Sequence, residues 1–522
     1  MSSRVLAQEP IHIGSRRELF VEDTLIERLG GAGRVQLHQP VRREVVFQTD
    51  APWEGNACGY PSVIQEGRTI RLYYHGLHYT DGGAATLQLP DHPAVMCFAE
   101  STDGLCFTRP ELGVCEWNGS KANNIVLTAG TVGAVGGDPA HTSVFQDANP
   151  DCPPEQRYKT IILGKGVLAG EGCGSLYCLV SPDGIHWSPL SDTPIITRGA
   201  FDSQNLAFWD PVRQEYREYH RGFREEDPSI TGQFNGVRDI LTSVSPQIGS
   251  FPEPQWLSYP EAPVEHLYTN QIMPYCRAPH LFIGFPMRYT EGDWRDTVFD
   301  LPGVEERMAR ATAHPRFGTA VTDALFMASR DGLTFKRWPE AFLRPGPQQI
   351  GSWVYGDNML ARGMAQTPSA LPGAPDELSL YATEHYWEGT HMVFRRCSLR
   401  RDGFVSVGAP LAGGEIVTKP IVFEGGSLAL NLETSGAGGV QVEVQNAAGN
   451  ALPGYGLADC PAIRGDMLGH IVRWTGGNDV TALAGQPVRL RFVLHDADLY
   501  AFQFVPRVPE PVRPEIPKPA AG

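Results

Sequence analysis

Acidic, histidine, arginine and aromatic residues gather at a few places along the chain, each beside a segment typical of a β-strand. The clearest are Phe201-Asp202-Ser-Gln-Asn205 before one segment and Glu384-His385-Tyr386-Trp387 after another. Cleavage of a glycosidic bond needs two carboxyl groups, one protonated and one ionised. Tyr and Trp offer flat surfaces to sugar rings, while Arg, His and Asn bind hydroxyl or acid groups. We therefore take Asp202, Glu384 and Asp323 as candidate catalytic carboxylates, with the acid and base roles left open.

Further polar and aromatic residues occupy the same kinds of position and are candidates for substrate binding. They are Glu54, Asp138, His141, Asn205, Arg221, His266, Asn270, Arg288, Tyr355, Asp357 and His385. The ten cysteines contain no Cys-x-x-Cys pair, and the histidines show no metal-ligand spacing. We expect no metal in the site and no required cofactor.

An internal repeat must position these residues. Ser101-Thr-Asp103-Gly104, Ser181-Pro-Asp183-Gly184 and Ser329-Arg-Asp331-Gly332 each follow a β-rich run, and Asp-Gly favours a hairpin turn because both residues tolerate positive φ. A degenerate copy starts at Ser243, and a last copy contains Asp402-Gly403. One unit therefore spans about 75 residues and recurs five times. The aspartates of these turns are assigned to the turns themselves and not to chemistry.

Each unit contains a first strand, a turn, a second strand, a loop, a third strand, the Asp-Gly hairpin and a fourth strand. Five units of four antiparallel strands predict an all-β fold, a five-bladed β-propeller. The start of the first strand, the end of the second and the start of the third share one face, so the candidates should meet at one mouth of the channel. The alternative is a large sandwich with coincidental Asp-Gly turns.

The predicted organisation has four parts. An N-terminal segment covers residues 1–20, the propeller 21–408, a β-sandwich 409–506 and a Pro-rich tail 507–522. The sandwich is predicted from period-two patterns such as Ser427-Leu-Ala-Leu-Asn-Leu, separated by Gly-rich turns.

Composition excludes several classes of function. The chain has 522 residues, a formal charge of −16 and 42% hydrophobic residues, so it is globular and acidic. No nucleic-acid partner is expected of an acidic chain, and no membrane partner, since no run of about 18 apolar residues occurs. The N-terminus has no apolar segment, although residues 6–8 could be the stub of a removed signal. Localisation stays open between the cytoplasm and a secreted or periplasmic location, and no oligomeric state is predicted.

The predicted architecture resembles the five-bladed glycoside hydrolases of families 32, 68, 43 and 62, and the trailing sandwich is most similar to family 32. The family-32 motifs are replaced, by Trp53-Glu54-Gly-Asn56 in the first unit, Gly137-Asp138-Pro139 in the second and Phe201-Asp202-Ser in the third. A distant family of the family-32-like kind fits best. The resemblance implies a glycoside hydrolase acting on oligo- or polysaccharides, with a structural Ca²⁺ held by oxygen ligands as a further option.

Three other functions remain open at this point. The same aromatic and polar groups could bind sugars without cleaving them, as in a lectin. The propeller could be a scaffold for protein partners, or the enzyme could be a sugar lyase or phosphorylase. Turnover of glycosides would distinguish a glycoside hydrolase from a lectin.

Overall fold

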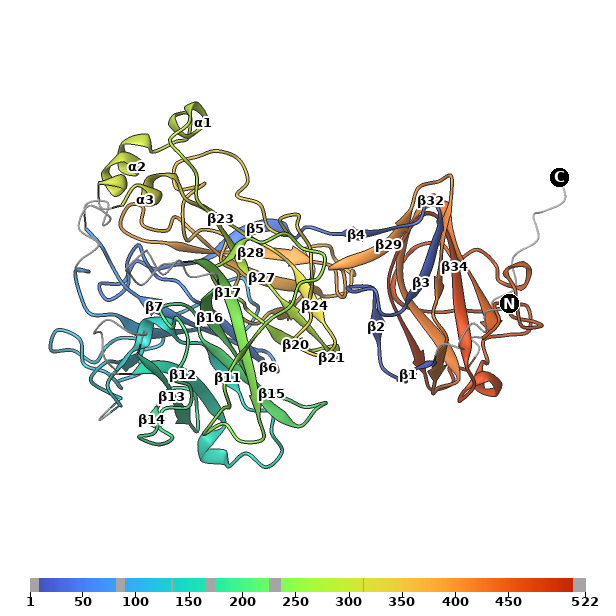
Figure 1. Ribbon diagram of the computed structural model, residues 1–522, viewed down its shortest axis with the longest axis horizontal. Coiled ribbons are helices and arrows are strands. Elements are labelled where there is room, and N and C mark those ends of the chain that lie inside the picture. The colour runs from blue at the N-terminus through green and yellow to red at the C-terminus, as the bar shows by residue number, and fades with distance from the viewer. Residues whose placement is uncertain are drawn as a thin grey trace. The chain divides into compact units, whose positions relative to one another are not determined.

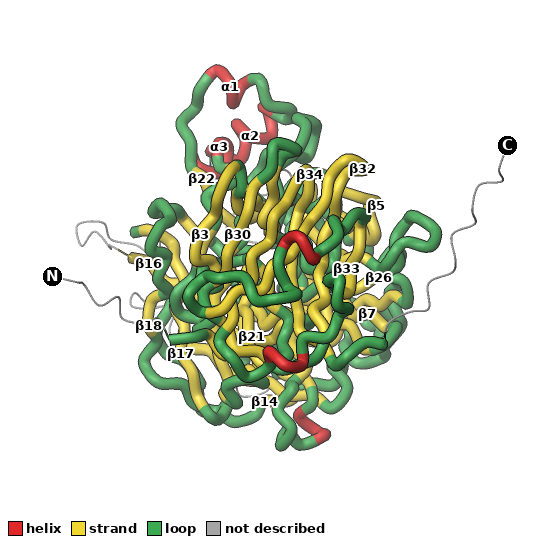
Figure 2. Tube along the Cα trace, turned by 90° about the vertical axis from the view of Figure 1, so that its right-hand side faces the viewer, coloured by secondary structure: helices red, strands yellow, loops and turns green. Residues whose placement is uncertain are grey.

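A computed structural model of the chain describes residues 9–80, 90–132, 135–164, 174–224, 236–312 and 314–509. The chain divides into two compact units, one formed by Gln39–Arg400 and the other by Met1–His38 with Arg401–Gly522 (Figure 1). Strands make up most of the regular structure of both units (Figure 2). The expectation of an all-β chain is therefore confirmed.

Small antiparallel sheets succeed one another along Gln39–Arg400. The first contains β6 (Ser62–Glu66), β7 (Thr69–Gly76), β8 (Val95–Ser101) and β9 (Ile125–Thr128). The second contains β10 (Gly137–Asp138), β11 (Val144–Gln146), β12 (Tyr158–Gly164), β13 (Ser175–Ser181) and β14 (Ser188–Pro189). The third contains β15 (Leu206–Asp210), β16 (Glu215–Arg224), β17 (Val237–Ser245) and β18 (Gln255–Trp256).

Two short sheets come next. One contains β19 (His266–Leu267), β22 (Met287–Thr290) and β23 (Val321–Ala324), and the other β20 (Met273–Tyr275), β21 (Ala278–Gly284), β24 (Met327–Ser329) and β25 (Lys336–Arg337). Only two residues separate β21 from β22 and β23 from β24, so the two sheets continue the same runs of chain. The last sheet contains β26 (Ala365–Thr367), β27 (Glu377–Glu384), β28 (Val393–Leu399) and β5 (Val41–Gln48).

The three regular Asp-Gly hairpins form as predicted. Asp103 Oδ1 accepts a hydrogen bond from the amide of Leu105 at 2.8 Å, and Gly104 has φ +75°. Asp183 and Asp331 make the same contacts, with the amides of Ile185 and Leu333. These carboxylates therefore serve the turns.

The fifth copy of the repeat differs from the expectation. The fourth strand of the last sheet is β5, which precedes the first sheet in sequence and pairs with β28 from Val393↔Gln48 to Ser398↔Val41. The residues after Asp402-Gly403 form β29 (Val405–Ala409) in the other unit instead, because Val405 and Val407 are fully buried there. The prediction of a fourth strand after Asp402 was wrong, and residues 21–38 and 401–408 group with the C-terminal segment.

The other unit is built from strands of both chain ends. They are β1 (Ile11–Gly14), β2 (Glu18–Leu19), β3 (Ile26–Gly31), β4 (Arg34–Leu37), β29, β30 (Gly414–Thr418), β31 (Ile421–Phe423), β32 (Ser427–Asn446), β33 (Asp466–Ile471) and β34 (Val488–Val505). The long strands β32 and β34 pair antiparallel along their length. Alternate residues such as Leu428, Leu430 and Leu432 enter one apolar core, as the period of a strand requires.

Helices are few and short among the described residues. α1 (Asp296–Phe299), α2 (Val304–Ala311) and α3 (Arg316–Thr319) lie between β22 and β23 (Figure 1). Two buried arginines of α2 hold the chain segments around Trp353 and Glu388. Arg307 donates to the Trp353 carbonyl at 2.8 Å, and Arg310 pairs with Glu388 at 3.1 Å. No helix within the described ranges has the length and apolarity to cross a membrane.

Candidate functional site

The site forms where first strands begin and second strands end. Leu206 at the start of β15 pairs with Tyr219 of β16, two residues before Arg221. Asp202, just before β15, consequently meets Arg221, and the two side chains form an ion pair. In the preceding sheet, β10 pairs with β12 in the same antiparallel way and places Asp138 opposite Leu163, at the end of β12. The shared edge expected from the repeat therefore exists in these sheets.

A series of contacts and charge interactions joins this edge of the successive sheets, and we call its seven residues the contact ring. They are Tyr60, His141, Asp202, Arg221, Tyr268, Tyr355 and Tyr386. The rings of Tyr60 and His141 lie 5.2 Å apart, and the guanidinium carbon of Arg221 lies 5.0 Å from the ring centre of Tyr268.

Tyrosines complete the contact ring. Tyr268 lies 5.5 Å from Tyr355, which lies 5.6 Å from Tyr386, measured between ring centres. Burial, followed by the neighbouring Tyr268 and Tyr386, raises the pKa of Tyr60 well above its ordinary value. The Tyr60, Tyr355 and Tyr386 phenols stay protonated for the same reason, burial first, and can donate hydrogen bonds to a ligand.

A buried polar network lies beside Tyr60. Gln204 donates through Nε2 to the Tyr60 carbonyl at 3.0 Å, and Gln271 Nε2 donates to Gln204 Oε1 at 2.8 Å. The backbone has φ +51° at Tyr60 and +42° at Gln271, a left-handed conformation that is uncommon outside glycine and is enriched at functional sites. These contacts fix the backbone that carries the contact ring.

The Ca²⁺ that the resemblance gives as an option would take about six to eight oxygen ligands. The side-chain oxygens of Gln204 and Gln271 already accept hydrogen bonds, the second from Thr269 at 2.7 Å. Across the described ranges, no group of three or more His, Cys, Asp or Glu side chains is arranged to hold a metal ion. We derive no step through a cation.

Asp138 and His141 form a hydrogen-bonded acid–base pair in which each group shifts the pKa of the other. Asp138 Oδ2 lies 2.7 Å from His141 Nδ1, and Asp138 Oδ1 accepts the Ala140 amide at 2.9 Å at the start of a short 3-10 turn. Burial alone would raise the pKa of Asp138, but His141 and the Ala140 amide lower it to about 2. Burial likewise opposes the charge of His141, yet Asp138 and then Asp202 raise its pKa. Both side chains keep some exposure to solvent, 36% and 19%.

His75 of β7 contacts the turn that carries this pair, and it was not among the candidates chosen from the sequence. Its Nδ1 lies 3.0 Å from the Ala140 carbonyl, and its Nε2 accepts the Gly59 amide at 3.1 Å. Burial, with help from the charge of His141, lowers the pKa of His75 to about 4. His75 is therefore neutral near pH 7 and ties β7 to the turn that carries His141.

Glu384 lies in a different cluster from Asp202, although both were expected at one mouth of the channel. Glu384 forms ion pairs with Arg42 and with Arg395, the latter at 2.7 Å. Asp357 lies beside it and accepts the amide of Tyr386 at 2.9 Å. Burial raises the pKa of Asp357 well above its ordinary value. Asp357 and Glu384 both line a cavity of about 210 Å³.

Asp323 and Arg288 form an ion pair within a sheet. The two residues are cross-strand partners on β23 and β22, and the guanidinium binds the carboxylate through two nitrogens, at 3.0 and 2.6 Å. Side chains alternate along a strand, so this pair lies on the face opposite Tyr289 of β22. Arg288 also contacts Glu265 at 2.8 Å. Neither Asp323 nor Arg288 makes a described contact with the contact ring.

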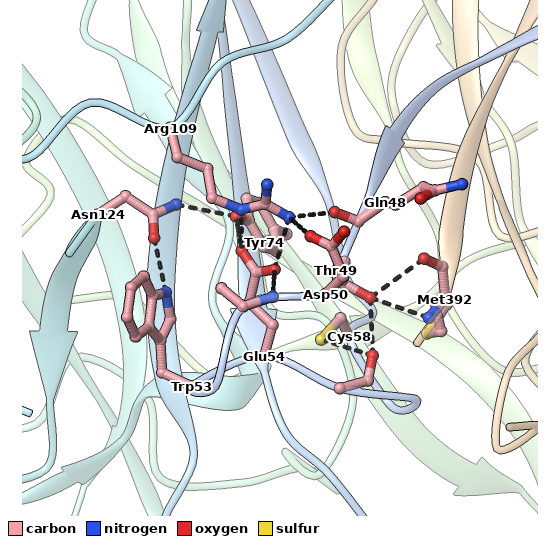
Figure 3. A network of polar contacts seen from close by, with 12 residues as sticks. Gln48, Thr49, Asp50, Trp53, Glu54, Cys58, Tyr74, Arg109, Asn124 and Met392 are labelled. Atoms are coloured by element: carbon pink, nitrogen blue, oxygen red, sulfur yellow. Dashed lines mark hydrogen bonds and ion pairs between the residues drawn. The ribbon is translucent and has the colours of Figure 1, made fainter. Parts of the chain in front are cut away.

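Glu54 is committed to a buried network (Figure 3). Its carboxylate accepts hydrogen bonds from Arg109 Nε at 2.9 Å and Nη2 at 2.8 Å, from the Ala51 amide at 3.0 Å and from the Tyr74 hydroxyl. The side chain is fully buried. Glu54 was a candidate for substrate binding, but these contacts give it a structural role in the segment before β6.

Three further candidates hold the backbone. Asn205 donates to the Phe201 carbonyl at 2.9 Å, Asn270 accepts the Ile272 amide at 3.3 Å, and His266 Nδ1 accepts the Arg238 amide at 3.2 Å. His385 has φ +67° in the turn that follows Glu384. These residues shape the loops around the contact ring but are not members of it.

The contact ring thus contains four of the sequence candidates and three tyrosines that the sequence did not single out. The candidates are Asp202, His141, Arg221 and Tyr355, with Asp138 paired to His141. Tyr60, Tyr268 and Tyr386 were missed, although Tyr268 stands between His266 and Asn270 and Tyr386 follows His385. Their position next to candidate residues is the feature of the sequence that could have identified Tyr268 and Tyr386.

Comparisons with known proteins find likeness only among solved structures. No protein-family model matches the chain, and no curated protein matches it. A protein described as a glycoside hydrolase shares 11% identity over 69% of this chain and 92% of its own, with a TM-score of 0.41. For an N-acetylgalactosamine deacetylase from F. plautii the values are 11%, 70%, 96% and 0.40. For an endo-arabinase from Bacteroides thetaiotaomicron VPI-5482 they are 10%, 67%, 96% and 0.39. At these identities and scores the likeness carries no argument about activity, which must come from the side chains.

Proposed function

We propose that this protein is a glycoside hydrolase that cleaves oligo- or polysaccharides at the contact ring. The single observation that carries the proposal is the gathering of Asp138, His141 and Asp202 beside the rings of Tyr60 and Tyr268. Acid, base and sugar-binding surfaces are brought together there from different sheets. A carbohydrate is the corresponding substrate.

The chemistry assigns a proton carrier and a carboxylate. Although burial opposes its charge, Asp138 raises the pKa of His141, so His141 keeps a proton to higher pH than a free imidazole and its Nε2 can protonate the leaving oxygen of the glycosidic bond. Asp202, fixed by Arg221, is the carboxylate that stabilises or attacks the anomeric carbon. The rings of Tyr268 and Tyr355 provide apolar surface for the sugar.

The same proposal includes the finer architecture. We assign the sheets of Gln39–Arg400 to five blades of a β-propeller, with the β19 and β20 sheets forming one blade and β5 closing the last. The strands around β32 and β34 are assigned to a β-sandwich. In a propeller the inner strands surround a channel whose mouth is formed by such loops, which is where ligands bind.

Turnover of a panel of aryl glycosides and plant or algal glycans tests the proposal. We expect release of the aglycone or of reducing ends by the wild type and a loss of about 10²–10⁴-fold in His141→Gln, the usual contribution of one general acid. Absence of turnover across the panel, together with measurable sugar binding, would favour the lectin-like alternative.

A further inference from the structure

Two buried guanidinium groups border the contact ring in a chain whose formal charge is −16. Arg221 of β16 and Arg238 of β17 are 2% and 3% exposed. The guanidinium carbon of Arg238 lies 4.6 Å from the ring centre of Tyr289. A third, Arg316, is close enough for its charge to act on Arg238. Three guanidinium groups of the described residues therefore gather in one part of an acidic protein.

These guanidinium groups have fewer acceptors than their burial demands. Arg221 has five N–H donors, of which Nη2 binds Asp202, while Nε and Nη1 are buried without an acceptor. Nε of Arg238 is likewise buried without an acceptor, and its Nη1 lies 3.4 Å from the His266 ring. Buried charged donors without acceptors are costly, and a bound ion or ligand group is one way to satisfy them.

Among the described residues, the carboxylates paired with these arginines are Asp202, bound to Arg221, and Glu291. Glu291 is the carboxylate next to Arg238, at 3.8 Å, and lies at the same distance from Arg316. That separation is longer than a hydrogen bond, and Glu291 is 46% exposed. Burial is the main cause that lowers the pKa of Arg238, and the like charges of Arg221 and Arg316 lower it further against the opposing effect of Tyr268. An anion bound there would remove this repulsion.

We infer that the sugar bound at the contact ring carries an anionic substituent, a carboxylate or a sulfate ester, which Arg221 and Arg238 bind. The inference rests on the proposed function for the location of the sugar. Guanidinium groups suit this role because their planar donors match carboxylate and sulfate oxygens. A neutral sugar could offer hydroxyl oxygens as acceptors but no negative charge to offset the two buried cations.

Calorimetric binding to the full chain tests the inference without requiring turnover. The probes are the methyl glycosides of glucuronic acid, galacturonic acid and galactose 6-sulfate, each against its neutral parent, glucose or galactose. We expect at least one anionic sugar to bind the wild type about 10–100-fold more tightly than its parent, as charge-assisted hydrogen bonds predict. Added NaCl should reduce that preference. The carboxylate and sulfate arms identify which group is bound.

Arg238→Gln and Arg213→Gln form a matched pair of variants. Arg213 pairs with Asp210 at the other end of β15. Arg238→Gln should lose the preference for the anionic sugar, while Arg213→Gln should retain it. Since the wild-type comparison needs no variant, misfolding of Arg238→Gln leaves the test intact. Equal or weaker binding of every anionic probe relative to its parent overturns the inference.

The inference and the proposed function fail in different ways. Cleavage of neutral glycosides without any preference for anionic sugars would overturn the inference and keep the hydrolase. A salt-sensitive preference without turnover of any glycoside would keep the inference and overturn the hydrolase.

Discussion

The carboxylate of Asp138 and the imidazole of His141 lie 2.7 Å apart within one short 3-10 turn, and the pair stands next to Asp202. A histidine held in this way keeps its proton to higher pH than a free one. In the proposed function this pair is the proton donor, beside the ring of Tyr60.

The titration of His141 should respond to Asp138. We expect the pKa of His141 to lie above its ordinary value in the wild type and to fall in Asp138→Asn, because the stabilising charge is removed. The high-pH limit of activity should move to lower pH in the same variant. NMR titration of the imidazole protons measures this. Asp183→Asn is the matched control, since Asp183 has the same i,i+3 contact with His186, and a His141 shift in that control would contradict the assignment.

Acid stability should depend on His75. Its folded pKa of about 4 lies below the ordinary 6.5, so the unfolded chain binds more protons between these values. The contribution of His75 is present above pH 6.5 and is lost as pH falls towards 4, a change on the order of 3 kcal/mol. Urea unfolding at pH 4.5 and pH 7 should show a smaller difference in His75→Gln than in the wild type. An unchanged difference would contradict the burial of a neutral His75.

The Asp-Gly turns could be predicted from the sequence because their signal is local. An Asp-Gly pair carries its own hydrogen-bonding and conformational preference, as Asp103 and Gly104 show. The register that brings Asp202 to Arg221 follows from adjacent strands joined by a short turn. Both conclusions needed only neighbouring residues.

The remainder depended on partners distant in sequence. Val41–Gln48 and Val405–Ala409 are both strand segments, and only the packing of the folded chain decides that the first closes the last sheet. In the sequence, Glu54 and Asp202 are both acids within polar segments. In the structure, Glu54 is buried and pairs with Arg109, which lies 55 residues further along the chain. Sequence position alone does not separate a catalytic acid from one held in such a pair.

Glu54 and Arg109 should contribute to stability as a unit. Arg109→Gln should lower the free energy of unfolding by about 3 kcal/mol, since it leaves the buried Glu54 carboxylate without its cation. Glu54→Gln should cost less, because Arg109 is 27% exposed and keeps its ion pair with Asp50. The double variant should cost less than the sum of the two, as for contacting residues. Urea unfolding measures all three. Arg157→Gln breaks the half-exposed contact with Glu66 and should cost under about 1 kcal/mol; additivity of the Glu54 and Arg109 changes would exclude their coupling.

Tyr355 should be needed for sugar affinity. Its ring lies 5.5 Å from Tyr268 and 5.2 Å from Trp387, so it is the centre of the aromatic side of the contact ring. Tyr355→Leu should weaken sugar binding about 10-fold, the scale of one aromatic contact and its buried area. Calorimetry measures this. Tyr455→Leu, which removes a ring packed 5.3 Å from Trp474 in the other unit, should leave affinity unchanged; the reverse pattern would place the sugar elsewhere.

The central claim is that Asp202 performs chemistry, and β15 offers a matched comparison for it. Asp202 precedes this strand and pairs with Arg221, whereas Asp210 ends the strand, is fully buried and pairs with Arg213 at 2.7 Å. Each aspartate can be changed to asparagine with the same loss of charge beside an arginine.

The most direct measurement is the rate of turnover by Asp202→Asn and Asp210→Asn, on the glycoside that the wild type hydrolyses fastest and below the unfolding temperature of both variants. We predict that Asp202→Asn is slower than the wild type by about 10²–10⁴-fold or more, while Asp210→Asn stays within about 2-fold and loses only stability. Turnover by Asp202→Asn at the wild-type rate would contradict the account.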